Sequence, residues 1–139
     1  MRLIRDGLAA AALAVVLAWP APAAAADLRG DWLTEGASAV VRIEPCAPPG
    51  ADRLCGRIVW LWRPRDDAGP PLIGRQILDG FAPKSPGQWS GGTIFNPEDG
   101  RTYAASLSAD GEDGLSVEGC FLLICRKQLW RRPGALCAR

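Results

Sequence analysis

The side chains most able to do chemistry in this 139-residue sequence are its cysteines and two pairs of neighbouring carboxylates. There are five cysteines but no histidine, which excludes Ser-His-Asp triads, Cys-His pairs and the commonest zinc sites. Asp66-Asp67 and Glu98-Asp99 could serve acid–base catalysis, but both lie in turn-like segments, where solvated charges are the usual occupants. No G-x-S-x-G, P-loop or dinucleotide glycine motif occurs. We therefore expect no enzyme, no metal and no cofactor.

The spacing of the cysteines favours disulfide bonds. They stand at positions 46, 55, 120, 125 and 137, without the C-x₂-C pairs typical of metal sites. Sequence alone leaves three pairings of four cysteines open. However, Cys46 and Cys55 flank a turn-rich stretch, and Cys120 and Cys125 flank a shorter link, so each pair could close its own hairpin. We predict these two disulfides, with Cys137 unpaired and able to join two chains.

Tryptophan is the other prominent residue type, with six in the chain. Trp60 and Trp62 are two apart on one predicted strand and so share a face. Such rings could form the wall of an apolar ligand site inside a barrel, or they could fill the barrel as ordinary core. A ligand would be contacted from the third, fifth and sixth predicted strands. The expected ligand-binding residues are Trp60, Trp62, Trp89, Phe95 and Tyr103.

The fifth predicted strand places two of these rings near two glycines. Trp89 and Phe95 have the same parity, so an inward face could hold both rings. Gly91 and Gly92 lie between them, and the missing side chains would leave room beside the rings. Glycine in a strand can equally mark a bend that curves the barrel, with nothing bound. Both alternatives remain open.

Strands must position these residues, because apolar residues recur with period two and glycine and proline punctuate the chain at short intervals. The sequence has 16 glycines and 12 prolines, and no stretch has the length and caps of a helix. The predicted strands lie at residues 30–35, 39–45, 55–63, 74–81, 88–96, 102–108, 115–121 and 125–132. Short turns between consecutive strands predict an all-β fold, a small antiparallel up-and-down barrel of about eight strands. An open sandwich is the alternative.

Residues 1–26 have the three parts of a signal peptide. Two arginines precede an uncharged run from Leu8 to Trp19, and a small-residue tract follows at 21–26. The apolar run is roughly a dozen residues long, against about 20 for a membrane-spanning helix. No cysteine stands near the cleavage point to receive a lipid. We predict cleavage between Ala26 and Asp27, leaving one domain, residues 27–139, in the periplasm or secreted, with no membrane anchor.

Cleavage would also balance the charge of the chain. The predicted signal contains two of the 16 basic and one of the 15 acidic residues, which leaves 14 of each. An overall balance of this kind gives no reason to expect nucleic acid or an anionic membrane as a partner.

Five segments of the chain together point to a known family. They are residues 30–35 (GDWLTE), 41–46 (VRIEPC), 54–61 (LCGRIVWL), 89–103 (WSGGTIFNPEDGRTY) and 128–132 (QLWRR). In these segments the chain resembles the bacterial exported family called domain of unknown function 2147. The resemblance extends over essentially the whole predicted mature chain. It implies a lipocalin-like, calycin-type barrel in the bacterial envelope, and it brings no activity.

The resemblance also implies how the barrel closes. In calycin barrels, a G-x-W at the start of the first strand lays its indole across the closed end, and an arginine on the last strand covers it. Gly30, Trp32 and Arg132 match this pattern, and a guanidinium stacks favourably on an indole. The chain departs from the family in one respect, because the Asp/Asn/Pro/Arg-rich insert usual between the third and fourth strands is missing. A family site that uses the insert would be incomplete here.

Two functions from different classes fit these observations. The first is an envelope carrier or sensor that binds a small apolar ligand in the barrel. The second is a non-enzymatic structural or interaction module with a filled barrel, whose loops, such as Asn96–Gly100 or Pro64–Pro71, contact another envelope protein. A connected apolar cavity of about 300 Å³ or more would favour the first, and a filled barrel the second.

Overall fold

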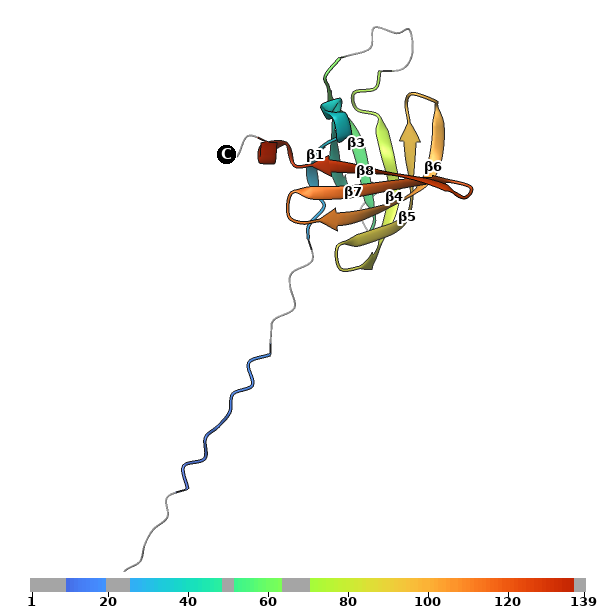
Figure 1. Ribbon diagram of the computed structural model, residues 1–139. Helices are drawn as coiled ribbons and strands as arrows, with labels where there is room; N and C mark the ends of the chain where they lie inside the picture. The colour runs from blue at the N-terminus through green and yellow to red at the C-terminus, as the bar shows by residue number, and fades with distance from the viewer. Residues whose placement is uncertain (1–9, 20–25, 49–51, 64–70, 137–139) are drawn as a thin grey trace, which may run out of the picture.

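The computed structural model describes residues 10–19, 26–48, 52–63 and 71–136 (Figure 1). Within them lie two short 3-10 helices, η1 (Glu35–Ala37) and η2 (Pro133–Leu136). The strands are β1 (Gly30–Leu33), β2 (Ala39–Pro45), β3 (Leu54–Leu61), β4 (Gln76–Ser85), β5 (Gln88–Asn96), β6 (Arg101–Asp110), β7 (Gly114–Phe121) and β8 (Ile124–Arg131). Residues 10–19 have no regular secondary structure and extend away from the strands. Among the described residues, no helix is long and apolar enough to cross a membrane.

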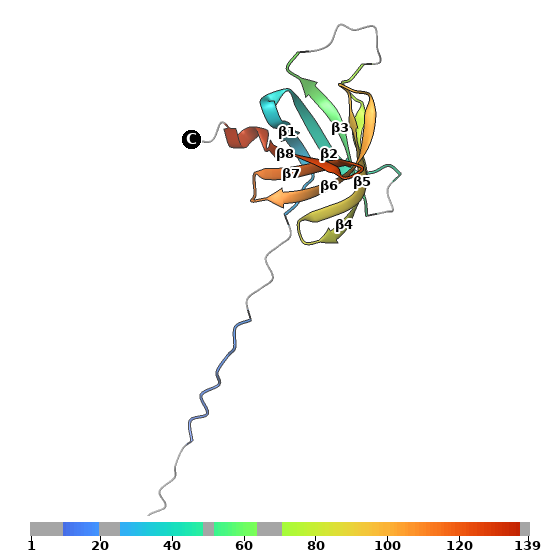
Figure 2. The ribbon, with the colours of Figure 1, turned by 45° about the vertical axis from the view of Figure 1, so that its right-hand side comes forward.

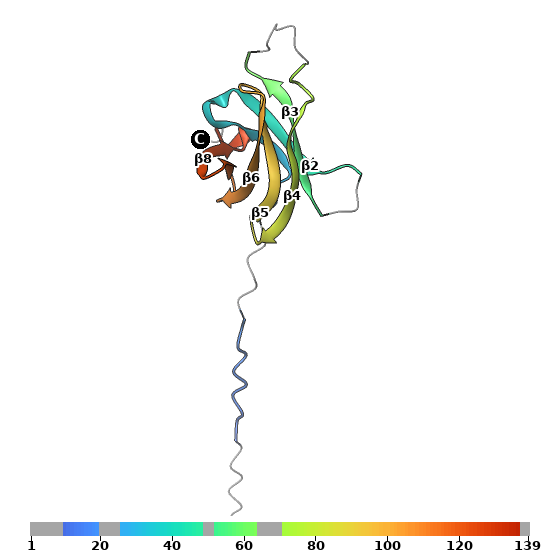
Figure 3. The same ribbon diagram turned by 90° about the vertical axis from the view of Figure 1, so that its right-hand side faces the viewer.

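The strands form one closed antiparallel barrel in which each strand pairs with its neighbours in the sequence. Figures 2 and 3 show the hairpins following one another around it. The predicted all-β up-and-down barrel is therefore confirmed. Its weakest seam lies between β1 and β8, where the register joins a single pair, Leu33 with Arg131.

Because the strands are antiparallel, their connections alternate between two ends of the barrel. The approach to β1, the end of β8 and the β2–β3, β4–β5 and β6–β7 turns lie at what we term the closed end. The other end, termed the open end, holds η1 and the β3–β4, β5–β6 and β7–β8 connections (Figure 1).

The predicted strand limits differ most from the structure at β4, which runs from Gln76 to Ser85 where the sequence predicted residues 74–81. β1 ends at Leu33, two residues early, because Gly36 adopts a φ of 80° in η1 and turns the chain toward β2. β4 continues past Pro83. The register shifts between Pro83 and Ser85, and a bulge of this kind tolerates the missing backbone N–H of proline.

Both predicted disulfides are present, Cys46–Cys55 and Cys120–Cys125. The first bridges the β2–β3 connection, and the second joins directly paired residues of β7 and β8. Each closes the local hairpin that the cysteine spacing predicted. Cys137 lies outside the described residues, so its pairing remains a prediction.

Inward-facing side chains form a continuous buried core in the barrel. Trp32, Phe81 and Trp130 are the largest of them, and none is more than 1% exposed. The rest of the buried cluster consists of Leu28, Val41, Ile43, Leu54, Ile58, Ile77, Leu78, Ala105, Leu107, Leu115 and Val117. Among the described residues, no polar or charged side chain is buried with them. Removal of this apolar surface from water is the main source of stability of the fold.

Two glycines allow large side chains to occupy the interior. A Cβ atom on Gly92 would lie 2.5 Å from the Phe81 ring, and one on Gly56 would lie 2.9 Å from Leu78. The space that Gly92 could have left beside a ligand is therefore taken by Phe81. Gly91 has a φ of 73° and lies where the register of β5 shifts, so it marks a bulge, which was the alternative that the sequence left open.

We expect Gly92→Ala to lower the free energy of unfolding by about 1–3 kcal/mol, because the added methyl group overpacks the core against Phe81. In the double variant Phe81→Leu/Gly92→Ala the methyl group gains room. The losses in free energy of unfolding of Gly92→Ala and Phe81→Leu, added together, should therefore exceed the loss of the double variant. Urea denaturation of the parent and the three variants measures this difference. Strictly additive losses would contradict the contact.

Candidate functional site

At the closed end, Arg132 covers the indole of Trp32, with its guanidinium carbon 3.9 Å from the ring centroid. The same guanidinium donates hydrogen bonds to the backbone carbonyls of Asp27, at 2.8 Å, and Asp31, at 3.3 Å. Trp32 Nε1 in turn donates to the carbonyl of Leu28 at 2.7 Å. These contacts tie the segment before β1 to the end of β8, across the weakest seam of the barrel. Trp32 and Arg132 therefore form a structural closure.

Gly30 belongs to this closure because Arg132 lies directly over it. The φ of Gly30 is 109°, a conformation that side-chain-bearing residues rarely adopt, and a Cβ atom there would lie 2.8 Å from Arg132 Nη1. A larger residue would displace the guanidinium from the indole.

Trp60 and Trp62 lie outside the barrel, so the expectation that their face turns inward is wrong. Val41 is fully buried and pairs with Ile58, whereas the preceding Val40 pairs with Trp60. One extra residue on β3 at this point reverses inside and outside along the strand. Trp60 is 41% exposed and Trp62 67% exposed, and their rings meet edge to face with centroids 6.2 Å apart.

Trp89 and Phe95 lie on opposite faces of β5, so the expectation that one inward face holds both rings is also wrong. Trp89 pairs with the buried Leu107, whereas Phe95 pairs with Thr102, an odd number of positions away along β6. The bulge in β5 breaks the alternation between them. Both rings are partly buried and contact the core, but Phe95 does so from the outer face of β5, with the guanidinium carbon of Arg75 4.0 Å from its ring centroid.

Tyr103 faces inward near the open end, where its ring meets Phe121 edge to face with centroids 6.1 Å apart. Its hydroxyl donates a hydrogen bond to Asp99 in the β5–β6 turn. This bond, with a second from the backbone N–H of Arg101, lowers the pKa of Asp99. The same bond raises the pKa of Tyr103.

The carboxylate pair Glu98-Asp99 thus belongs to a turn. Asn96 Oδ1 accepts the backbone N–H of Glu98 at 2.9 Å, and Asp99 Oδ1 accepts that of Arg101 at 2.8 Å. These bonds stabilise the turn that the N-P-E-D-G sequence predicts. The other pair, Asp66-Asp67, lies outside the described residues.

The five residues expected to bind a ligand do not meet in one site. Trp89 and Tyr103 face inward, whereas Trp60, Trp62 and Phe95 lie outside. Beside Trp89, the space that Gly92 leaves is occupied by the ring of Phe81.

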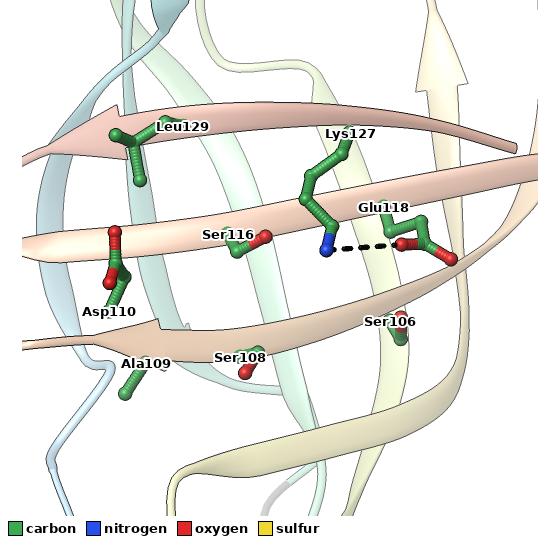
Figure 4. Close-up of a pocket in the computed structure, with 8 residues that line it drawn as sticks. All are labelled: Ser106, Ser108, Ala109, Asp110, Ser116, Glu118, Lys127 and Leu129. Carbon is green, nitrogen blue, oxygen red and sulfur yellow. Dashed lines mark ion pairs between the residues drawn. The ribbon is translucent and has the colours of Figure 1, made fainter.

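The described residues also line a groove of about 430 Å³ on the outer face of β6, β7 and β8 (Figure 4). Its lining residues are Ser106, Ser108, Ala109, Asp110, Ser116, Glu118, Lys127 and Leu129. Lys127 Nζ lies 3.7 Å from Glu118 Oε2. Among the hydrogen bonds of the described residues, none joins a serine of this groove to a carboxylate. The groove thus holds three serine hydroxyls beside one ion pair.

Two groups of sulfur and carboxylate atoms come close together, Cys46 and Cys55 with Asp79, and Cys120 and Cys125 with Glu118. In both groups the sulfurs are joined in a disulfide. They do not offer the thiolates that metal ions bind.

The sequence-based expectations did not include a set of exposed apolar residues at the open end. Within the barrel domain, the exposed large apolar side chains that the structure describes are Trp60, Trp62, Ile73, Phe121, Leu122, Leu123 and Ile124. All of them belong to or adjoin the β3–β4 and β7–β8 connections. Part of the signal was visible in the sequence, because residues 121–124 read FLLI in a hairpin turn, where glycine and polar residues are usual.

Comparison with known proteins agrees with the barrel fold. The family described as "Uncharacterized protein conserved in bacteria (DUF2147)" matches residues 30–132. The chain belongs to this family. No curated protein matches the DUF2147 chain. Among solved structures, protein HP1028 from Helicobacter pylori, described as belonging to the lipocalin family, is 14% identical, with a TM-score of 0.66 over 77% of this chain and 83% of that one. This likeness supports a lipocalin-like fold.

We expect Trp32→Ala to lower the free energy of unfolding of the DUF2147 barrel by about 3–5 kcal/mol, the usual loss for a deleted buried ring. Arg132→Lys should lower it by less, because lysine keeps the charge but cannot lay a planar group on the indole. Arg131→Lys is the matched control, since Arg131 is the exposed neighbour on β8. If the two lysine variants unfold at the same urea concentration, the stack does not hold the seam.

The chain has one tyrosine, so the alkaline absorbance change of tyrosinate reports on Tyr103 alone. We expect the pKa of Tyr103 to lie above the ordinary value of about 10, because its proton is held by Asp99. Asp99→Asn should bring this pKa back toward the ordinary value, and Glu98→Gln, one residue away, should leave it unchanged. An unshifted pKa in the parent protein would show that the hydrogen bond is not kept in solution.

Proposed function

We propose that this DUF2147 protein is an exported, non-enzymatic interaction module of the bacterial envelope. Residues 1–26 would be its cleaved signal peptide, and the chain from Asp27 onward would work in the periplasm. Two disulfides support this location, because disulfides persist in oxidising compartments. Contact with another envelope protein, made by the loops of the open end, is the proposed activity.

The distribution of apolar side chains is the observation that carries the proposal. Inside, the rings of Trp32, Phe81 and Trp130 are buried in a continuous core. Outside, the exposed large apolar residues of the barrel domain gather on two connections of the open end. A protein that carries its ligand in the lumen needs the reverse arrangement, with apolar walls around a space. The packed core together with the exposed apolar loops supports a scaffold that presents loops.

Trp60 and Trp62 are the proposed contact for a protein partner. Their rings meet edge to face and are 41% and 67% exposed, at the end of β3. Tryptophan is enriched among the residues that dominate the binding energy of protein interfaces, because it buries a large rigid surface and has an N–H donor. A paired arrangement of two such rings loses little side-chain freedom on binding.

One arm of the test asks whether the barrel is a carrier. Tryptophan fluorescence of the chain from Asp27 onward is followed during titration with fatty acids, isoprenoids and aromatic metabolites. We expect a flat signal, because Trp89 is packed against the core and Phe81 fills the space beside it. A saturable change that is lost in Trp89→Ala, with the variant folded, would establish the carrier alternative and overturn the module.

The second arm looks for the partner in cells. Trp62 and Lys84 are replaced, one at a time, by a photoreactive amino acid in the exported protein. Both positions are exposed, but Lys84 lies on β4 near the closed end. We expect a discrete cross-linked protein from position 62 that is absent from position 84 and is lost on Trp60→Ser. Equal products from both positions, or none from position 62, would contradict the proposed contact.

A further inference from the structure

The β7–β8 hairpin ends in four consecutive large apolar residues, Phe121–Ile124, which we term the apolar tip. Their exposed fractions are 51%, 85%, 99% and 70% in chain order. In Figure 1 the hairpin reaches beyond the neighbouring strands at the right of the view. The tip is thus a convex projection in which Phe121 contacts Tyr103, whereas Leu122 and Leu123 have almost no support from the rest of the barrel. Apolar residues this exposed and contiguous mark a surface that is covered in use.

The choice of residues in the turn is unfavourable for the hairpin alone. Leu122 has a φ of 55°, a left-handed conformation in which glycine or asparagine is strongly preferred over leucine. Leu123, beside it, is 99% exposed and adds no core contact. The Cys120–Cys125 disulfide directly below joins the two strands and keeps the hairpin closed despite this turn. The turn therefore exposes apolar side chains although its backbone conformation at Leu122 is unfavourable for leucine.

Two arginines lie beside the apolar tip. The guanidinium carbon of Arg101 lies 6.0 Å from the ring centroid of Phe121, and Arg126 follows Cys125 on β8. Both arginines are exposed, and neither takes part in the ion pairs that the described residues form.

The acidic groups near the tip offset part of this charge. Glu118 pairs with Lys127, and the Asp99 carboxylate, which accepts the hydroxyl of Tyr103, also interacts with Arg101. Arg126 therefore remains beside the apolar tip as a cation without an ion-pair partner among the described residues, although the charge of the predicted mature chain balances overall.

We propose that the apolar tip inserts into the surface of a membrane that contains anionic phospholipid, with Arg126 against the phosphate groups. A convex apolar tip with an unpaired arginine beside it suits a fluid surface, which closes around it, whereas a protein partner must offer a preformed pocket. Peripheral binding of this kind strengthens with inserted apolar area and with attraction to anionic lipid. The inference rests on the proposed export and concerns a different surface from Trp60 and Trp62.

The test is flotation of the purified chain from Asp27 onward, which contains every strand of the barrel but not the apolar residues 8–19. The vesicles are phosphatidylcholine alone or phosphatidylcholine mixed with phosphatidylglycerol. We expect binding to the mixed vesicles that weakens with added salt. The double variant Leu122→Asn/Leu123→Ser should bind at least about tenfold more weakly, because it removes two inserted leucines. Arg126→Gln should weaken binding about fivefold.

Ile73→Ser is the matched control, because Ile73 is also an exposed apolar residue of the open end but lies in the β3–β4 connection. It should bind like the parent. Asparagine tolerates the backbone conformation of position 122, so the double variant should keep its fold, which circular dichroism and the intact Cys120–Cys125 disulfide verify. Failure of the parent to float with the mixed vesicles, or equal losses in Ile73→Ser and the double variant, would overturn the proposal. Binding of the tip to another protein without lipid binding would overturn it as well.

Discussion

The stack of Arg132 on Trp32 is the interaction on which the barrel depends. β1 has four residues and meets β8 through one residue pair, so the backbone ladder alone is a weak seam. Without a better join, the two strands would present unpaired edges and the sheet would open. Arg132 compensates by contacting the indole face and two carbonyls of the opposite segment at once. Gly30 is required in turn, because only a residue without a side chain leaves room for the guanidinium.

The large side chains at the closed end also determine how the interior of the barrel is packed. Once Trp32 and Trp130 occupy the barrel near the closed end, the remaining width is taken by Phe81 lying against the bare backbone of Gly92. Leu78 packs against the backbone of Gly56 in the same way. Interiors packed in this way change shape very little, because displacing one ring requires the movement of its neighbours. The packed core is thus a rigid support for the loops that connect its strands.

The features that were predictable from the sequence are those encoded locally. Strand positions followed from period two, both disulfides followed from cysteine spacing, and the closure followed from Gly30, Trp32 and Arg132 through the family resemblance. The faces of Trp60 and Phe95 were not predictable, because one extra residue in β3 and one in β5 reverse the alternation beyond it. In β5, Gly91 was a visible hint of a bulge. In β3 the chain offers no glycine at the shift, so counting residues along the strand could not locate it.

The two disulfides lie at opposite ends of the barrel and constrain different features of it. Cys46–Cys55 bridges the β2–β3 connection, at the same end of the barrel as Arg132. Cys120–Cys125 lies at the opposite end, one residue pair below a turn that leucine disfavours. A hairpin held only by backbone hydrogen bonds could relieve such a turn by fraying and folding its apolar residues back onto the open end. The disulfide prevents this rearrangement, because separation of the two strands stops at Cys120. The tip must then keep its leucines in solvent until another surface covers them, which is the condition that an insertion device has to meet.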